Sequence, residues 1–233
     1  MEIGGIQKTT LIDYPGKIAT TVFIIGCNFR CPFCYSSELV LPAKIKNQPR
    51  ISRADFFDFL RERRELLDGV VICGGEPTIH QELPDFVKEI KRLGFLVKLD
   101  TNGSKPEMLE KLIKNELLDY IAMDVKGPKE KYDFFSGTND NIDINGIEKS
   151  LNILKKEVIE YEFRTTIAPG LSKEDILKIV KWIGPAKRYF LQEVKLDKEI
   201  VNPQIKTLPF LSRIEIEKIV REIKSQFKVC KVR

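Results

Sequence analysis

Residues 17–34 read KIATTVFIIGCNFRCPFC, an apolar run rich in β-branched residues that leads directly into a loop with three cysteines. The run at 17–25 has the composition of a buried strand. Cys27, Cys31 and Cys34 follow, so one short loop holds three of the chain's five cysteines. The interpretation of both the fold and the chemistry depends on which kind of site requires three thiols at the end of a strand.

Other short apolar runs resemble the first, and each ends in a polar or glycine-containing motif. They are 69–73 before GGEPT, 95–100 before TNG, 120–125 before KGP, 161–167 before APG, and 188–194 before a polar stretch. Apolar residues at three- and four-residue spacing predict helices over approximately 53–66, 84–93, 106–116, 146–156, 172–183 and 212–226. Ser52, Ser104 and Ser172 are predicted N-caps, and Gly94 is a predicted C-terminal stop.

Strands that alternate with helices predict parallel strands joined by right-handed crossovers. Six such units fill the chain, so residues 1–233 are expected to form one domain. The architecture is a closed or partial α/β barrel, or an open doubly wound sheet. In each of these, ligands bind beyond the carboxyl ends of the strands, and the chain's unusual motifs all fall there.

Composition favours a protein of the reducing cytoplasm. A chain of 233 residues can bury a core without cross-links, and its five cysteines are an odd number, with Cys73 and Cys230 far from the cysteine loop. No leader-like start and no apolar run near the ~20 residues of a membrane span is present. The net charge of +5 is scattered among mixed-sign runs, which favours solvated helix faces over a nucleic-acid site.

Four explanations compete for the cysteine loop: a disulfide, a zinc site, a catalytic thiol, or an iron–sulfur cluster one ligand short. Zinc sites and closed clusters take four ligands, and the fourth could be Cys73, Cys230 or His80. Cys73, however, ends a buried strand, Cys230 lies near the last residue, and His80 falls on a predicted loop. A lone histidine beside clustered cysteines does not form a nucleophile–base pair. An open [4Fe-4S] cluster remains.

The motif C-x3-C-x2-C in CNFRCPFC, with an aromatic residue before the last cysteine, is similar to the signature of the radical S-adenosylmethionine (radical SAM) superfamily. GGEP after the second predicted strand resembles the second hallmark of that family. The resemblance covers essentially the whole chain. It implies a partial (β/α)6 barrel of parallel strands, with the cluster loop at 26–37 after the first strand.

The same resemblance implies one [4Fe-4S] cluster, with three irons held by Cys27, Cys31 and Cys34. S-adenosylmethionine would chelate the fourth iron, and an electron from the cluster would cleave it to methionine and a 5′-deoxyadenosyl radical.

A narrower resemblance rests on the motifs TTLIDYPGKIATTVFIIGCNFRCPFC, SELV, VVICGGEPT, LDTNG, MDVKGP and TTIAPG. They are similar to those of glycyl radical enzyme activases, above all the anaerobic ribonucleoside-triphosphate reductase activating group, with pyruvate formate-lyase activators as cousins. This implies a glycyl radical partner, an anaerobic ribonucleotide reductase or a formate-lyase-like enzyme, and a low-potential electron donor, flavodoxin or ferredoxin. The chain departs from the pattern at Tyr35-Ser36-Ser37, where those activators have His-Asn-Pro.

Two alternatives stay open on the sequence. One is a radical SAM enzyme with a small-molecule substrate, similar to 7-carboxy-7-deazaguanine synthase. The other is a non-enzymatic zinc or electron-transfer module with Cys73 as the fourth ligand.

Cofactor-site residues are expected at the strand ends. Gly74 and Gly75 let the backbone approach a ligand closely, and the resemblance implies that this turn, with Glu76 beside it, meets the methionine amino group. It also implies that Phe33 lies near the adenine. Asn102 is either a cofactor contact or only a turn residue.

Asp124 and Lys126 lie two residues apart and are expected to point to one side of the sheet. The resemblance implies that both meet S-adenosylmethionine, and that Asp100, Thr101 and Asp124 hold a monovalent cation beside its carboxylate. Arg164 is costly to bury unless it meets an anion, whether from the protein or from the ligand. Gln192 is a candidate for the adenine or ribose by position alone.

Overall fold

The structure is a computed structural model that describes residues 1–140 and 142–233. One eight-stranded sheet runs through it in the order β1-β2-β3-β4-β5-β6-β7-β8. The strands are β1 (Ile3–Thr10), β2 (Ala19–Ile24), β3 (Gly69–Gly74), β4 (Leu96–Thr101), β5 (Tyr120–Asp124), β6 (Glu160–Ile167), β7 (Ala186–Glu193) and β8 (Phe227–Val232). β1 pairs antiparallel with β2, and every later pair is parallel.

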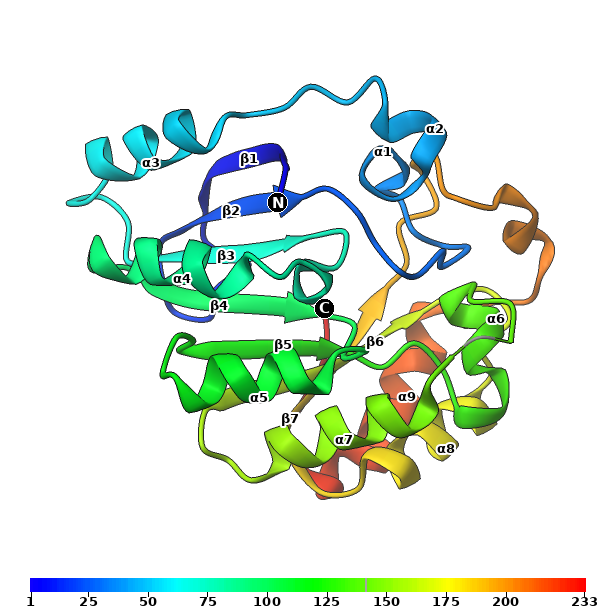
Figure 1. Cartoon of the computed structure of the whole chain (residues 1–233). Coiled ribbons are helices and arrows are strands. Elements are labelled where there is room, and N and C mark those ends of the chain that lie inside the picture. The colour runs from blue at the N-terminus through cyan, green and yellow to red at the C-terminus, as the bar shows by residue number, and fades with distance from the viewer. Residues whose placement is uncertain (141) are drawn as a thin grey trace.

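The six predicted strands are confirmed as β2 to β7, and so is the α/β fold with a mostly parallel sheet. The sheet is curved and the helices lie along its outside, as Figure 1 shows. β1 and β8 are its two edges. The sheet is thus a partial barrel with two strands more than the sequence predicted.

Six longer helices correspond to the predicted ones: α3 (Arg53–Glu62), α4 (Leu83–Arg92), α5 (Pro106–Lys114), α7 (Ile144–Lys155), α8 (Lys173–Ile183) and α9 (Arg213–Ile223). Ser52 and Ser172 are N-caps as predicted, because their side chains accept hydrogen bonds from Asp55 N and Asp175 N. The N-cap prediction for Ser104 is wrong. α5 begins at Pro106, the residue predicted for the start of this helix, but Lys105 and not Ser104 precedes it as the N-cap residue.

Shorter helices lie in the loops at the carboxyl ends of the strands, namely α1 (Ser37–Val40), α2 (Pro42–Ile45) and α6 (Tyr132–Ser136). No helix in the described part of the chain has the length and apolar character needed to cross a membrane.

Aromatic side chains close the interior of the sheet at the amino ends of the strands. Tyr14, from the loop between β1 and β2, packs on Tyr120 at the start of β5 with ring centroids 6.0 Å apart. Both rings are buried in a small cluster with Ala19 and Val71. These rings cover the amino end of the interior, and the cysteine loop lies at the opposite, carboxyl end of the strands.

Candidate active site

The cysteine loop joins β2 to α1 and is held by main-chain contacts with distant segments. Arg30 N donates to Ser136 O at 2.8 Å, which fastens the loop to α6. After β7, the chain returns across the loop: Val201 N donates to Cys34 O and Asn202 N to Pro32 O, each at 2.9 Å. We call residues 195–209 the strap, because these hydrogen bonds hold the segment against the cysteine loop; it is the orange segment beside α1 and α2 in Figure 1.

The three thiols of the loop are shielded from water. Cys31 is buried, and Cys27 and Cys34 are partly buried. Burial raises the pKa of Cys27 and of Cys31 to about 12, and it also raises the pKa of Cys34. The thiols are therefore protonated at neutral pH, and a metal centre bound by them would have to displace their protons.

The donor set fits an iron–sulfur cluster. It consists of three soft sulfur ligands in a shielded loop, the environment in which thiolate-bound clusters occur. Among residues 1–140 and 142–233, no three His, Cys, Asp or Glu side chains are gathered closely enough to hold a single metal ion. Cys73 is the last residue but one of β3, and Cys230 lies on β8 at the far edge of the sheet.

The glycines of the GGEPT turn are required by contact with the start of the cysteine loop. A Cβ on Gly74, which has a φ of +113°, would lie 2.4 Å from Ile24 N, and a Cβ on Gly75 would lie 1.9 Å from Gly26 O. In the same place, Glu76 N donates to Gly26 O at 2.8 Å. The two motifs singled out in the sequence are thus in direct main-chain contact.

Glu76 turns its carboxylate into the protein. It is 1% exposed and accepts hydrogen bonds from Thr78 N at 3.1 Å and from Thr101 Oγ1 at 2.7 Å. Its other oxygen accepts from Asn102 N at 2.6 Å. Burial raises the pKa of Glu76, and these hydrogen bonds oppose the rise. Glu76 therefore ties the GGEPT turn to the DTNG turn.

Asn102 makes the contacts of a turn residue. Its Oδ1 accepts from Ser104 N at 2.9 Å, and its Nδ2 donates to Asn28 Oδ1 at 3.0 Å. Since Asn28 belongs to the cysteine loop, the DTNG turn touches that loop as well. The cysteine loop, the GGEPT turn and the DTNG turn form one connected unit.

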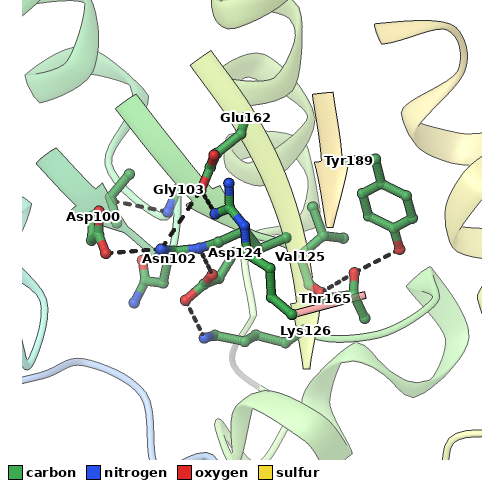
Figure 2. A network of polar contacts seen from close by, with 12 residues as sticks. Asp100, Asn102, Gly103, Asp124, Val125, Lys126, Glu162, Thr165 and Tyr189 are labelled. Atoms are coloured by element: carbon green, nitrogen blue, oxygen red, sulfur yellow. Dashed lines mark hydrogen bonds and ion pairs between the residues drawn. The ribbon is translucent and has the colours of Figure 1, made fainter. Parts of the chain in front are cut away.

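An ion-pair network connects the ends of β4, β5 and β6. Arg164 Nε donates to Asp124 Oδ1 at 2.8 Å, and its Nη1 to Asp100 Oδ2 at 2.9 Å. Lys126 Nζ donates to Asp124 Oδ2 at 3.0 Å, a contact that Figure 2 shows. Although burial alone would raise the pKa of the Asp124 carboxyl, Arg164 and Lys126 lower it to about 2. Arg164 thus meets protein carboxylates, the first of the two kinds of anion expected.

Two charged residues deep in the sheet extend this network. Glu162 is fully buried on β6 and accepts from Tyr120 Oη and from Arg233 Nη1, each at 2.8 Å. Lys98 is 1% exposed on β4 and its Nζ contacts Asp100 Oδ1.

The network has more positive than negative side chains. The basic ones are Lys98, Lys126, Arg164 and Arg233, and the acidic ones are Asp100, Asp124 and Glu162, a surplus of one positive charge. A site with this balance can accept one more carboxylate.

Phe33 and Gln192 lie at the same rim. Phe33 is buried in the cysteine loop. Gln192 follows Phe190 by two residues on β7, so both lie on one face of the sheet, and the Phe190 ring centroid is 3.4 Å from the guanidinium carbon of Arg233. The position of Gln192 on this face of β7 is therefore the observation that places it near the ion-pair network.

Tyr35, which replaces the usual histidine, is partly exposed with the ammonium groups of Lys195 and Lys198 over its ring.

The sequence reasoning missed Lys98 and Glu162. Both are charged residues within apolar strands, and each precedes a predicted site residue, Asp100 or Arg164, by two positions. The same-face rule that drew attention to Asp124 and Lys126 would have found them.

Comparison with known proteins identifies the family of this chain. The model of the radical SAM superfamily matches residues 21–183. A provisionally named glycyl-radical enzyme activating enzyme of Methanocaldococcus jannaschii is 35% identical over 221 residues, which is 93% of this chain and 89% of that protein. The pyruvate formate-lyase-activating enzyme of Clostridium pasteurianum is 28% identical over 189 residues, covering 78% of this chain and 75% of that enzyme.

Solved structures show the same fold at low identity. Streptococcus suis SuiB bound to S-adenosylmethionine matches with a TM-score of 0.64 and 15% identity over 91% of this chain. TYW1 with a lysine-pyruvate adduct matches with a TM-score of 0.59 and 18% identity, over 89% of this chain and 73% of TYW1. This chain spans 51% of the SuiB chain. Together with the matches in sequence, they place the chain in the radical SAM superfamily and, within it, in the family of glycyl-radical enzyme activating enzymes.

Proposed function

We propose that this protein activates a glycyl radical enzyme, an anaerobic ribonucleotide reductase in the first instance. When bound, one [4Fe-4S] cluster and S-adenosylmethionine supply a 5′-deoxyadenosyl radical, which removes an α-hydrogen from a glycine of the partner. One observation supports the proposal most directly. The loop with three thiols, the GGEPT and DTNG turns, and a network rich in cationic side chains lie together at one rim of a partial barrel.

The chain's own residues would position these groups. Cys27, Cys31 and Cys34 would ligate three irons, and the Gly74-Gly75 backbone would lie beside the loop because it already contacts Gly26. Glu76 fixes this turn through its contacts with Thr101 and Asn102.

The cationic groups would orient the ligand carboxylate. Lys126 and Arg164 would face it, while Asp124 keeps both charged. Burial of the network excludes water, which strengthens these charge interactions. Contacts of Phe33 with the adenine, and of Asn102 and Gln192 with the cofactor, stay predictions.

The partner could also be a formate-lyase-like enzyme, since Tyr35-Ser36-Ser37 leaves the subgroup open. The proposal includes a flavodoxin or ferredoxin as electron donor and a place in the reducing cytoplasm, where thiols stay available for iron. The monovalent cation expected at Asp100, Thr101 and Asp124 is treated in the next subsection.

The test begins with the cluster. The iron-reconstituted, dithionite-reduced protein is examined anaerobically by EPR, with and without S-adenosylmethionine. A [4Fe-4S]⁺ signal that changes on addition of S-adenosylmethionine is expected. The Cys31→Ala variant should lose this response and the matched Cys73→Ala variant should keep it. Loss of metal in Cys73→Ala, with no response to S-adenosylmethionine, would instead support the closed metal module.

The second stage tests the partner. The reduced protein is mixed with an anaerobic ribonucleotide reductase, and a glycyl doublet is sought by EPR. Its appearance on the reductase supports the proposal. A partner that never acquires the radical, while a small substrate is consumed, would show that the small-molecule alternative holds.

A further inference from the structure

The place expected for a monovalent cation is already filled by positive charges of the protein. Each of the four carboxylate oxygens of Asp100 and Asp124 accepts from a cationic nitrogen: Asp100 from Lys98 and Arg164, Asp124 from Arg164 and Lys126. The remaining expected ligand, Thr101, donates its hydroxyl to Glu76 Oε1 at 2.7 Å and accepts from Gly103 N at 3.1 Å. These residues do not fit a further metal cation.

Lys98 is the member of this set that the rest of the site does not explain. Lysine is almost never fully buried unless it is paired, because burial disfavours its charged form. Lys98 is 1% exposed, its Nζ contacts Asp100 Oδ1, and the same atom lies 5.9 Å from the ring centroid of Tyr120. The pairing with the Asp100 carboxylate is therefore what explains a charged group buried at this desolvation cost.

The balance of charges around Asp100 and Asp124 shows what Lys98 does there. Asp100 and Asp124 both face one guanidinium, that of Arg164, so the pair would keep a negative surplus without further cations. Lys126 neutralises one of the carboxylates from the rim and Lys98 neutralises the other from inside the sheet. A ligand carboxylate arriving beside them would otherwise meet an uncompensated Asp100.

We infer that Lys98 is a positioning residue whose ammonium group, buried against Asp100, takes the role of a monovalent cation and makes cofactor binding independent of K⁺ and Na⁺. An ammonium group and a potassium ion carry the same charge, are similar in size and both bind carboxylate oxygens. The inference rests on the proposed function only in that S-adenosylmethionine is the ligand.

The test measures S-adenosylmethionine binding to the reconstituted protein by equilibrium dialysis, in choline chloride, NaCl or KCl at equal ionic strength. Wild-type affinity should change less than about twofold among the three salts. Lys98→Ala should bind about tenfold more weakly in choline chloride, the loss typical of one charge-assisted contact, and KCl should restore most of it because an ion can enter the vacated space. Lys98→Met is the matched control, since it removes the charge but fills the space; it should bind weakly in every salt.

Two results would overturn the inference: a wild-type protein that needs K⁺ or Na⁺ for tight binding, or a folded Lys98→Ala variant that no salt restores. Unfolding temperatures in the same salts show whether the variants are folded, and KCl should raise that of Lys98→Ala selectively. The wild-type comparison decides the inference even where a variant does not fold. Failure to radicalise a partner leaves these measurements unaffected, whereas absence of S-adenosylmethionine binding in every salt contradicts the proposed function itself.

Discussion

The carboxylate of Glu76 accepts a hydrogen bond from the main-chain N–H of Asn102 at 2.6 Å, across 26 residues of sequence. This contact joins the turn after β3 to the turn after β4. Through Gly26 and Asn28, both turns are also joined to the cysteine loop. The geometry of the thiol loop therefore depends on a buried carboxylate that lies outside the loop.

Replacing Glu76 with alanine should lower the free energy of unfolding by about 3 kcal/mol or more, because several buried donors, including Asn102 N and Thr101 Oγ1, would lose their acceptor. Urea unfolding of the apoprotein measures this. Glu82→Gln is the control, since that exposed carboxylate pairs with the N-terminal amine at the surface and its loss should leave the free energy of unfolding close to that of the wild type. Equal effects of the two changes would contradict the role given to Glu76.

A methyl group on Gly75 should disrupt the cysteine loop. In Gly75→Ala the new Cβ would lie 1.9 Å from Gly26 O, so the turn and the loop have to separate. We expect iron incorporation on reconstitution to fall at least severalfold. Gly5→Ala offers a control, because its Cβ would meet only the Phe23 ring at 3.9 Å and iron loading should stay at the wild-type level. Normal iron content in Gly75→Ala would show that the close approach does not matter.

Asp124 should make stability depend on pH in the acid range. Its pKa is about 2 in the folded protein and 3.8 in the reference state, so the folded state favours the ionised form. This contribution is complete above the unfolded pKa and is lost as the pH falls through the folded pKa. About 1 kcal/mol should be lost between pH 6 and pH 3.

Urea unfolding of the apoprotein at these two pH values measures the loss. Asp124→Asn should show a correspondingly smaller difference between pH 6 and pH 3, because its side chain does not titrate. The same pH difference in both proteins would mean that Arg164 and Lys126 do not hold the carboxylate in its charged form.

Much of the fold could be predicted because its strands are buried on both faces. In β3, Val70, Val71 and Ile72 are fully buried, and such runs are recognisable in sequence. β1 and β8 are edge strands that mix exposed and buried positions, and β1 contains Gly4 and Gly5. Their strand character comes from pairing with a neighbour, and composition does not reveal it.

The site divides in the same way. The cysteine spacing and the Gly-Gly turn are local, so the sequence was enough to locate them. The orientation of Glu76 is a property of two turns meeting, and no spacing along the chain predicts it. Lys98 and Glu162 lie between these cases, since the alternation of a strand predicts their face but not their partners.

The strap has a consequence for the order in which this protein is made. Val201 and Asn202 supply the N–H groups that hold the carbonyls of Cys34 and Pro32, so segments far apart along the chain complete one loop. A ribosome releases the cysteines long before it has synthesised the segment that fixes them. Iron bound to these thiols in the native geometry would therefore have to arrive after the strap is synthesised, and metal acquired earlier would meet a loop that is not yet held in place.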